Sequence, residues 1–303
     1  MHSFEHVLAH VLNEPLLAHP AKAEIVAGVV LRRAGVEIHV ESTAIASSLG
    51  PLQERSMRER SMRWGEGKPF LFQDGIAGIE IVGSLAHRQW HIGKSSGVMG
   101  YDGIGAQLDA ALEDGEVQAI LLDIHSAGGE VPGAFNLADR IRAANAVKPV
   151  VAIADEMAFS AAYLLGAAAG ELWLASETAQ VGSVGVVAVH FSFAENLAEA
   201  GIKPTIIQAG ARKAEGNPFQ DLPESARSNL QKGVNAVYEI FVDRVAGFRA
   251  TSAKAVRDTE AGIFMGQEAV TMGLADGIAE PLAILGAMIA RARAGALPAP
   301  RRA

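Results

Sequence analysis

Short, mostly apolar runs recur along the chain and predict buried β-strands. Such runs, apolar on both faces, are typical of strands that are covered by helices on both sides. The runs begin with a strand-like stretch over residues 76–82 and continue as VQAILLDI (117–124), PVVAIA (149–154), ELWLA (171–175), VGVVAV (184–189) and PTIIQA (204–209).

Between these runs, apolar residues recur at helical spacing. In the longest such segment Val234, Val237 and Phe241 share one face, as expected of an amphipathic helix. Strands that alternate with helices in this way indicate an α/β fold with a largely parallel sheet and flanking helices. The predicted helices cover residues 104–112, 131–141, 159–169, 193–200 and 224–248.

The regular pattern occupies the middle of the chain. Residues 5–34 are predicted to be mainly helical, with Pro15 kinking or ending the first piece. Residues 51–68 are strongly charged and contain ERSMR twice, so we interpret them as a solvated helix or linker, or else as a docking or processing segment. We therefore predict three parts, which are an N-terminal helical arm and charged linker (1–70), one α/β domain (71–285) and a weakly ordered tail (286–303) rich in Ala, Arg and Pro.

The composition indicates in which compartment the protein resides and which classes of partner it does not bind. The formal net charge of −8 provides no overall basic field for a nucleic acid. The absence of cysteine excludes disulfides, thiolate zinc sites and a cysteine nucleophile, and it fits a reducing compartment. The N-terminus lacks the apolar core of a signal peptide, and no run reaches the roughly 18 apolar residues of a membrane span. We expect a cytoplasmic protein that binds neither nucleic acid nor membrane.

Two places along the chain could carry chemistry. Gly128 and Gly129 follow the strand predicted at 117–124. Backbone N–H groups without a nearby Cβ can stabilise an oxyanion there. Strand-to-helix turns, however, also use glycine routinely. Ser160 stands at the head of a predicted helix, near the positive end of its dipole and next to the unpaired N–H of Ala161. Ser160 is therefore either a helix N-cap or a nucleophile.

A serine nucleophile needs a general base, and the chain offers two kinds. His125 and His190 each end a predicted strand and Asp123 is close to the first, so a Ser-His-Asp triad stays open. Lys213 follows the predicted strand at 204–209, and a buried lysine can lose its proton near neutral pH. Most lysines, however, are simply surface charges.

Five segments, in their order and spacing, resemble the signal peptide peptidase A (protease IV) family of serine peptidases. The resemblance covers about residues 75–280 and is specific as a set. The segments are I-H-S-A-G-G-E-V (124–131), A-F-S-A-A-Y (158–163), V-G-S-V-G-V (181–186), G-A-R-K-A-E-G-N-P-F (210–219) and M-G-Q-E-A-V-T-M-G-L-A-D-G (265–277).

The resemblance implies a role for each matching residue. Ser160 is then the nucleophile, Lys213 is the general base, and Ser183 holds the lysine by a hydrogen bond. Gly129 contributes to the oxyanion hole, with the Ala161 N–H as the second donor. The family implies a ClpP/crotonase-like fold, assembly into homo-oligomeric rings, and no metal or other cofactor.

The chain departs from the family pattern at two positions. Ala127 replaces a proline in the first segment, and Arg212 adds a charge beside the expected base. Neither change removes a catalytic group. The segment N-E-P-L-L-A-H-P-A-K-A-E (13–24) resembles the phage head-maturation branch of the family, whose members cleave scaffold or other head proteins. Because the chain ends soon after the protease domain, we expect any scaffold to be a separate protein.

Three functions therefore follow from the sequence. The first is a serine endopeptidase with a Ser-Lys dyad, acting as a prohead protease on scaffold, portal or other head proteins. The second is an acyl-CoA-processing enzyme of the crotonase type, which would use the Gly-Gly turn on a thioester. The third is a non-catalytic capsid-assembly component. The set of Ser160, Ser183 and Lys213 favours the first, because a hydratase has no need of a serine–lysine pair.

Overall fold

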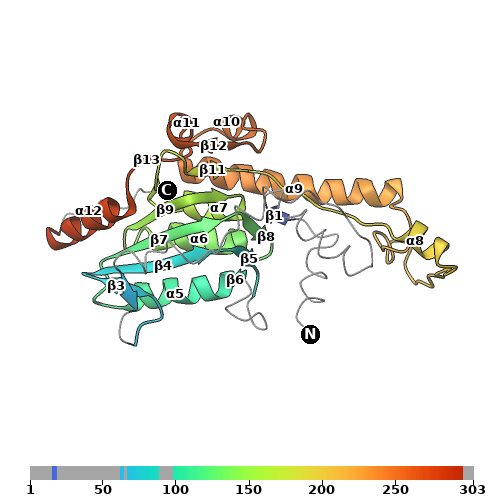
Figure 1. Ribbon diagram of the computed structural model, residues 1–303, viewed down its shortest axis with the longest axis horizontal. Helices are drawn as coiled ribbons and strands as arrows, with labels where there is room; N and C mark the ends of the chain where they lie inside the picture. The colour runs from blue at the N-terminus through green and yellow to red at the C-terminus, as the bar shows by residue number, and fades with distance from the viewer. Residues whose placement is uncertain (1–15, 19–61, 65–66, 89–97, 296–303) are drawn as a thin grey trace.

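The computed structural model describes residues 16–18, 62–64, 67–88 and 98–295, and for residues 16–18, 63 and 64 it describes the backbone alone (Figure 1). Most of the N-terminal arm and of the charged linker predicted over residues 1–70 therefore lies outside the described residues. So do the last residues of the chain.

A nine-stranded sheet forms the centre of the structure (Figure 1). Its strands are β2 (Arg63–Trp64), β3 (Leu71–Gln73), β4 (Ile76–Val82), β7 (Ala119–Ser126), β9 (Val150–Phe159), β10 (Glu171–Leu174), β11 (Gln180–Gly182), β12 (Ile263–Met265) and β13 (Gly277–Ile278). The order is β12-β11-β9-β7-β4-β3-β2, with β10 paired to β9 and β13. The strands β4, β7, β9, β10, β11 and β13 pair in parallel, and antiparallel pairs occur only towards the edges.

A second, four-stranded sheet lies at the carboxyl ends of β4 and β7. It consists of β1 (Leu16–Ala18), β5 (Ser84–Ala86), β6 (Val98–Gly100) and β8 (Gly128–Glu130), in the order β1-β8-β5-β6. Strands β5, β6 and β8 are parallel, whereas β1 is antiparallel to β8. Strand β5 follows β4 and strand β8 follows β7 after a single residue each, so the large sheet fixes the position of the small one.

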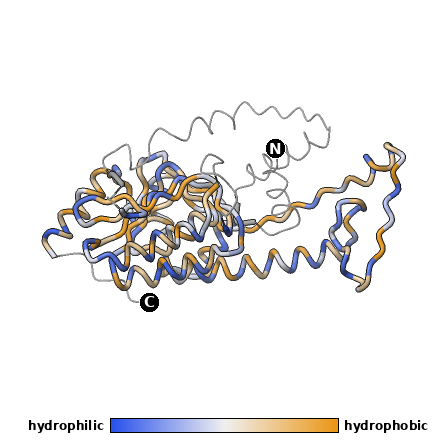
Figure 2. The backbone as a smooth tube through the Cα atoms, turned by 90° about the horizontal axis from the view of Figure 1, so that it is seen from below, coloured by the Kyte–Doolittle hydropathy of each residue, from blue (hydrophilic) through white to orange (hydrophobic). Residues whose placement is uncertain are grey.

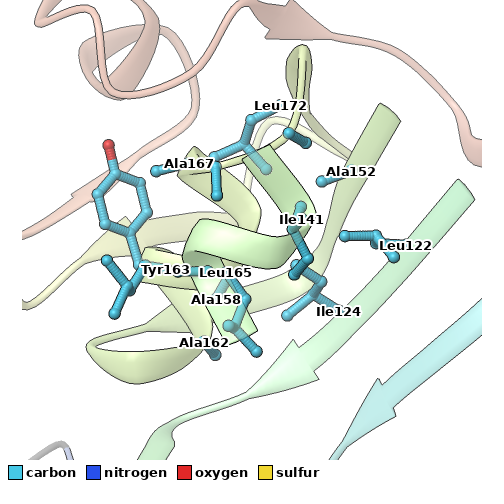
Figure 3. Packing of buried hydrophobic residues seen from close by; sticks show 14 of the residues in the cluster. Leu122, Ile124, Ile141, Ala152, Ala158, Ala162, Tyr163, Leu165, Ala167 and Leu172 are labelled. Atoms are coloured by element: carbon cyan, nitrogen blue, oxygen red, sulfur yellow. The ribbon is translucent and has the colours of Figure 1, made fainter. Parts of the chain in front are cut away.

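Eight helices are described: α5 (Tyr101–Glu113), α6 (Ala134–Ala144), α7 (Ala161–Ala167), α8 (Ala194–Glu199), α9 (Glu224–Arg249), α10 (Ala253–Arg257), α11 (Gly266–Thr271) and α12 (Pro281–Arg293). The apolar runs of the strands serve both faces of the large sheet. In β7, Ile120, Leu122 and Ile124 belong to the larger core, which contains residues of α5, α6, α7 and α9. Leu121 faces the other way, into a smaller core with Met288 of α12. Figure 3 shows part of the larger core between α6, α7 and the sheet.

The predicted α/β class is confirmed, as is the largely parallel sheet with flanking helices. Each strand and helix expected between residues 76 and 175 is present close to its predicted position. Long apolar runs specify these strands well because both of their faces are buried. The short strands β5, β6 and β8 were not predicted, and Gly128 and Gly129, which were expected in a turn, begin β8.

The helical prediction is wrong at residues 16–18, which form strand β1. Pro15 and Pro20 bracket this segment, and a proline disfavours helix both at its own position and at the residue before it. The segment instead pairs with β8, more than a hundred residues away in the sequence.

The strands expected at 184–189 and 204–209 are also absent from the described structure, apart from a single bridge residue at Val187. After β11 the chain leaves the sheet, and the run at 204–209 has no strand beside it among the described residues. Ile207 is 94% exposed as a result. The weakly ordered tail expected over residues 286–303 is wrong for residues 286–293, because α12 continues to Arg293 and buries Met288 and Ala292 against the sheet. Residues 296–303 lie outside the described residues.

Residues 187–223, which we call the extension, project from the body of the molecule. The extension runs beside α9 to the end of that helix, where α8 lies (Figures 1 and 2). The C-terminal part of α9 is anchored in the core by Phe241, Val242 and Val245. In its N-terminal part only Ala226 is buried, so half of this long helix stands out from the body together with the extension.

Candidate active site

Ser160 lies between the end of β9 and the start of α7, at the carboxyl edge of the parallel sheet. Its backbone has φ of +53° and ψ of −118°. A residue with a Cβ rarely adopts this conformation, which costs roughly 1–3 kcal/mol and occurs mainly at functional sites. The Ser160 N–H donates to the carbonyl oxygen of Gly182 (2.9 Å), which fixes the turn against β11.

The Ser160 side chain does not cap the helix that it begins. Ser160 occupies the N-cap position of α7, but its hydroxyl accepts no hydrogen bond from that helix. Its Oγ is buried and has no hydrogen-bond partner among the described residues. A buried hydroxyl without a partner is destabilising, so stability alone does not explain a serine at this position.

Ser183 lies directly beside Ser160. The parallel register of β9 and β11 pairs Phe159 with Gly182, and each serine is the residue that follows. Ser183 is 6% exposed, has φ of +54° and donates its N–H to Gly262 (2.7 Å). Two neighbouring strands thus present two buried serines at the same end of the sheet.

The Gly-Gly turn lies at the same edge. Ser126 of β7 is paired with Ala158 of β9, so Gly128 and Gly129 follow β7 next to the point where Ser160 follows β9. Helix α7 also packs against β8. Gly128 and Gly129, the first two residues of β8, therefore lie in the region of Ser160 and of Ala161, the first residue of α7.

Sequence reasoning did not single out Ser126, although it belongs to the S-A-G-G segment. Its hydroxyl donates to the carbonyl oxygen of Gly83 (2.6 Å) and accepts from the N–H of Gly128 (3.1 Å). Gly128 has φ of +94°, a conformation that glycine adopts without strain. Ser126 thereby holds the start of the Gly-Gly turn in one orientation.

Gly129 allows an unusually close approach of β5. A Cβ at this position would lie 1.8 Å from the carbonyl oxygen of Leu85. The carbonyl oxygen of Glu130, the residue after Gly129, accepts a hydrogen bond from the Tyr101 hydroxyl (2.8 Å). Burial, and to a lesser degree the charge of Glu130, raises the pKa of Tyr101 well above its ordinary value. The hydroxyl therefore stays protonated and remains a donor to β8.

Lys213 is not brought to this edge by its own chain. It lies in the extension between α8 and α9, where its side chain is exposed. This stretch is tied to α9 by the Asn229 side chain, which donates to Glu215 (3.0 Å). Asn229 precedes Phe241 in α9 by twelve residues, about 18 Å along a helix. Figures 1 and 2 show the stretch at the far end of α9 from α7.

The described histidines form no triad with Ser160, whose Oγ has no hydrogen-bond partner in this part of the chain. The Nδ1 atom of His125 instead lies 2.5 Å from the backbone carbonyl oxygen of Asp155. Within the described ranges no group of three His, Cys, Asp or Glu residues is placed to hold a metal ion. The described residues also include no helix long and apolar enough to cross a membrane.

Comparison with known proteins gives a consistent set of relatives. Residues 142–290 match the profile of the family described as "Peptidase family S49". The chain is 36% identical over 279 residues to "Head-tail preconnector protein GP5" of Enterobacteria phage P21, an alignment that covers 90% of this chain and 55% of that protein. It is 33% identical to "Capsid assembly protease C" of Escherichia phage lambda, covering 91% of this chain and 63% of that protein. The chain thus spans between half and two thirds of the length of these relatives.

Two solved structures align with the chain at low sequence identity. A mutant of the 1510-N membrane-bound stomatin-specific protease aligns with a TM-score of 0.43 and 14% identity, over 69% of this chain and 81% of that one. A mutant of ClpP1 from Listeria monocytogenes aligns with a TM-score of 0.41 and 14% identity, over 67% of this chain and 91% of that one.

Proposed function

We propose that the chain is a serine endopeptidase that cleaves proteins of the phage head during capsid assembly, because residues 142–290 match the profile of peptidase family S49. Ser160 is the nucleophile and Lys213 the general base in this proposal. The Ser160 Oγ attacks the scissile carbonyl carbon while the Lys213 amine takes the hydroxyl proton. That proton then passes to the leaving amine, and water hydrolyses the acyl-enzyme in a second step.

The conformation of Ser160 is the observation that carries the proposal. The serine is strained, its buried Oγ lacks a described partner, and it stands at the start of a helix at the carboxyl edge of a parallel sheet. Strain and an unsatisfied hydroxyl both cost stability, and such costs are typical of catalytic groups. A non-catalytic assembly component would gain nothing from either.

The Gly129 and Ala161 N–H groups are the proposed oxyanion donors. The close packing of β8 on β5 and the Ser126 hydrogen bonds fix the Gly-Gly turn before substrate binds. The first N–H groups of a helix have no acceptor within it, which leaves the Ala161 N–H available at the head of α7. Donors held in place in advance need no reorganisation in the transition state.

We further propose that Lys213 reaches Ser160 of a neighbouring subunit in a homo-oligomeric ring. A lysine that acts as a base must lose its proton, which burial favours, yet Lys213 is exposed in the single chain. The extension also carries the exposed apolar side chains of Ile202, Ile207 and Phe219. Exposed apolar side chains of this size indicate a surface that another molecule covers. Docking of the extension on a neighbour would bury these side chains and Lys213 together, with Ser183 orienting the amine.

The substrates follow from the two phage relatives, one named as a capsid assembly protease and the other as a head-tail preconnector protein. In the proposal, scaffold, portal or other head proteins are cleaved in the host cytoplasm, within the procapsid. Incubating purified wild-type protein with candidate head proteins, and mapping new termini by mass spectrometry, tests this. New termini with wild-type protein, but not with Ser160→Ala protein, are expected. Intact head proteins in both reactions would contradict the proposed substrates.

Ser183→Ala is expected to slow turnover. In the proposed mechanism the Ser183 hydroxyl orients the Lys213 amine that accepts the Ser160 proton, and the substitution removes this partner. The measurement is kcat for both proteins, with Ser252→Ala on the exposed start of α10 as a control. An unchanged kcat would show that Ser183 takes no part.

Gly129→Ala is expected to lower kcat by about a hundredfold or more, the cost of losing one oxyanion donor. The added Cβ would lie 1.8 Å from the backbone oxygen of Leu85, so β8 must move away from β5. Gly286→Ala in α12 is the matched control, because a Cβ there meets nothing within 4 Å. The control should keep full activity and gain about 0.5–1 kcal/mol of stability. Full activity in Gly129→Ala would exclude Gly129 from the oxyanion hole.

A further inference from the structure

The strand β1 occupies the outer edge of β8. In the order β1-β8-β5-β6, β1 is the last strand on that side. It runs antiparallel to β8, with Leu16 opposite Glu130, Leu17 opposite Gly129 and Ala18 opposite Gly128. The residues of the Gly-Gly turn that are proposed to bind the oxyanion are therefore the ones that β1 covers.

This edge is the place where the backbone of a substrate would bind. A peptide whose carbonyl group is to reach the Gly129 N–H must pass along β8 in an extended conformation. Extended peptides commonly bind by adding a strand to an exposed sheet edge, where main-chain hydrogen bonds supply the affinity. On its other side β8 is already paired with β5, so the edge covered by β1 is the one at which a peptide can add.

Resting on the peptidase function proposed above, we propose that residues 16–18 are an internal strand that competes with substrate for the edge of β8. The binding partner of this edge is an extended peptide backbone, and the chain supplies its own such segment, Leu-Leu-Ala. Substrate binds only when β1 leaves the edge. The N-terminal segment thereby keeps the peptide site closed in the free protein.

Tethering makes this competition effective. Residues 19–61 connect β1 to the described part of the chain before β2. A segment of the same chain binds at an effective concentration that decreases as the connection lengthens. A free peptide present below this effective concentration therefore competes poorly, even when it binds the edge as well as β1 does.

The strand pairing can be tested without any catalysis. The natural chain contains no cysteine, so the two introduced thiols are the only ones in each copy of the protein. In full-length Ser160→Ala protein, the double substitution Leu16→Cys with Glu130→Cys places two thiols opposite each other in the observed register. Opposed Cβ atoms lie about 4.5–5.5 Å apart, close to the span of a disulfide, whereas diagonal positions are about 7–8 Å apart. The control pair is therefore Ala18→Cys with Glu130→Cys.

The competition is tested by binding of a fluorescent peptide with the sequence of residues 12–22, LNEPLLAHPAK. Leu17→Pro removes a backbone N–H from β1 and should release the edge, whereas Leu17→Ala keeps the N–H. If β1 is bound about nine-tenths of the time, its release strengthens apparent peptide affinity by about tenfold. In the Ser160→Ala background, Leu17→Pro should bind the peptide about tenfold more tightly than Leu17→Ala. The oxidised 16/130 pair should bind it at least tenfold more weakly than the same protein after reduction.

The outcomes separate this inference from the peptidase function. Rapid oxidation of the 16/130 pair but not of the 18/130 pair, together with the expected affinities, supports the internal strand even if wild-type protein cleaves nothing. Equal oxidation of the two pairs would show that β1 does not pair in this register. Equal peptide affinity in Leu17→Pro and Leu17→Ala proteins, or in oxidised and reduced protein, would show that β1 does not compete. With an active Ser160, Leu17→Pro should also raise kcat/KM for the peptide by about the same factor.

Discussion

Ser160→Ala is expected to lower the cleavage rate by roughly a thousandfold or more, because removal of a serine nucleophile leaves only the contribution of binding and of the oxyanion hole. The same substitution should make the protein more stable. It deletes a buried hydroxyl that has no partner among the described residues, and an unsatisfied buried polar group costs about 1–3 kcal/mol. The expected result is a protein with almost no cleavage activity and a higher unfolding temperature. Head-protein cleavage and thermal unfolding of the two proteins measure both effects.

Ser252→Ala is the matched control for this prediction. Ser252 caps α10 and accepts a hydrogen bond from the N–H of Ala255 (3.0 Å). Its loss should cost about 1 kcal/mol of stability and leave activity unchanged. The same substitution at two helix N-caps is thus expected to have opposite effects on stability. Substantial residual cleavage by Ser160→Ala protein would exclude Ser160 as nucleophile, and a loss of stability would mean that its hydroxyl serves the fold.

The central part of the fold could be predicted from the sequence because its signals are local. The run at 117–124 is apolar on both faces, and the structure shows why, since Ile120 and Leu121 enter different cores on opposite sides of β7. Helix α5 likewise buries Ile104 and Leu108, as its spacing predicts. Where a strand or helix packs within the central sheet and its covering helices, its pattern of apolar residues is sufficient to predict it.

The failures occur where the partner of a segment is distant in the sequence or is not among the described residues. Strand β1 depends on pairing with β8, and no pattern within residues 16–18 reveals a partner more than a hundred residues away. The run at 204–209 is apolar without a strand beside it in the described structure, which leaves Ile207 exposed. Apolar periodicity shows that a residue will be covered, but it does not show by what.

The candidate site divides in the same way. The motifs indicated Ser160, Ser183 and the Gly-Gly turn, and the structure places all of these at one edge of the sheet. Their catalytic roles stay predictions. The supporting hydrogen bonds from Ser126 and Tyr101 depend on three-dimensional neighbours, which the sequence did not reveal. In the single chain Lys213 lies far from Ser160, Ser183 and the two glycines, at the other end of α9 (Figure 1).

Mixing Ser160→Ala protein with Lys213→Ala protein is expected to restore activity that neither possesses alone. A site formed between subunits is complete when one copy supplies Ser160 and its neighbour supplies Lys213. In randomly mixed rings with head-to-tail interfaces, about one quarter of such sites receive both intact residues. A site formed within one chain would receive both in none. The mixture should therefore recover about a quarter of wild-type kcat per site, whereas each parent stays inactive.

The control replaces the second protein by one that carries both Ser160→Ala and Lys213→Ala. Every copy in that mixture lacks the nucleophile, so subunit exchange cannot complete a site and the activity should stay at background. Exchange is established by co-expressing differently tagged copies and purifying through both tags in sequence. Doubly tagged hybrids of the two single variants that remain inactive would place Ser160 and Lys213 in the same subunit. The extension would then have to fold back towards α7 to carry Lys213 there, which is a large change from the arrangement in Figure 1. Restored activity would instead assign the exposed Ile202, Ile207 and Phe219 to the subunit interface, because the surface that delivers Lys213 is the one that they line.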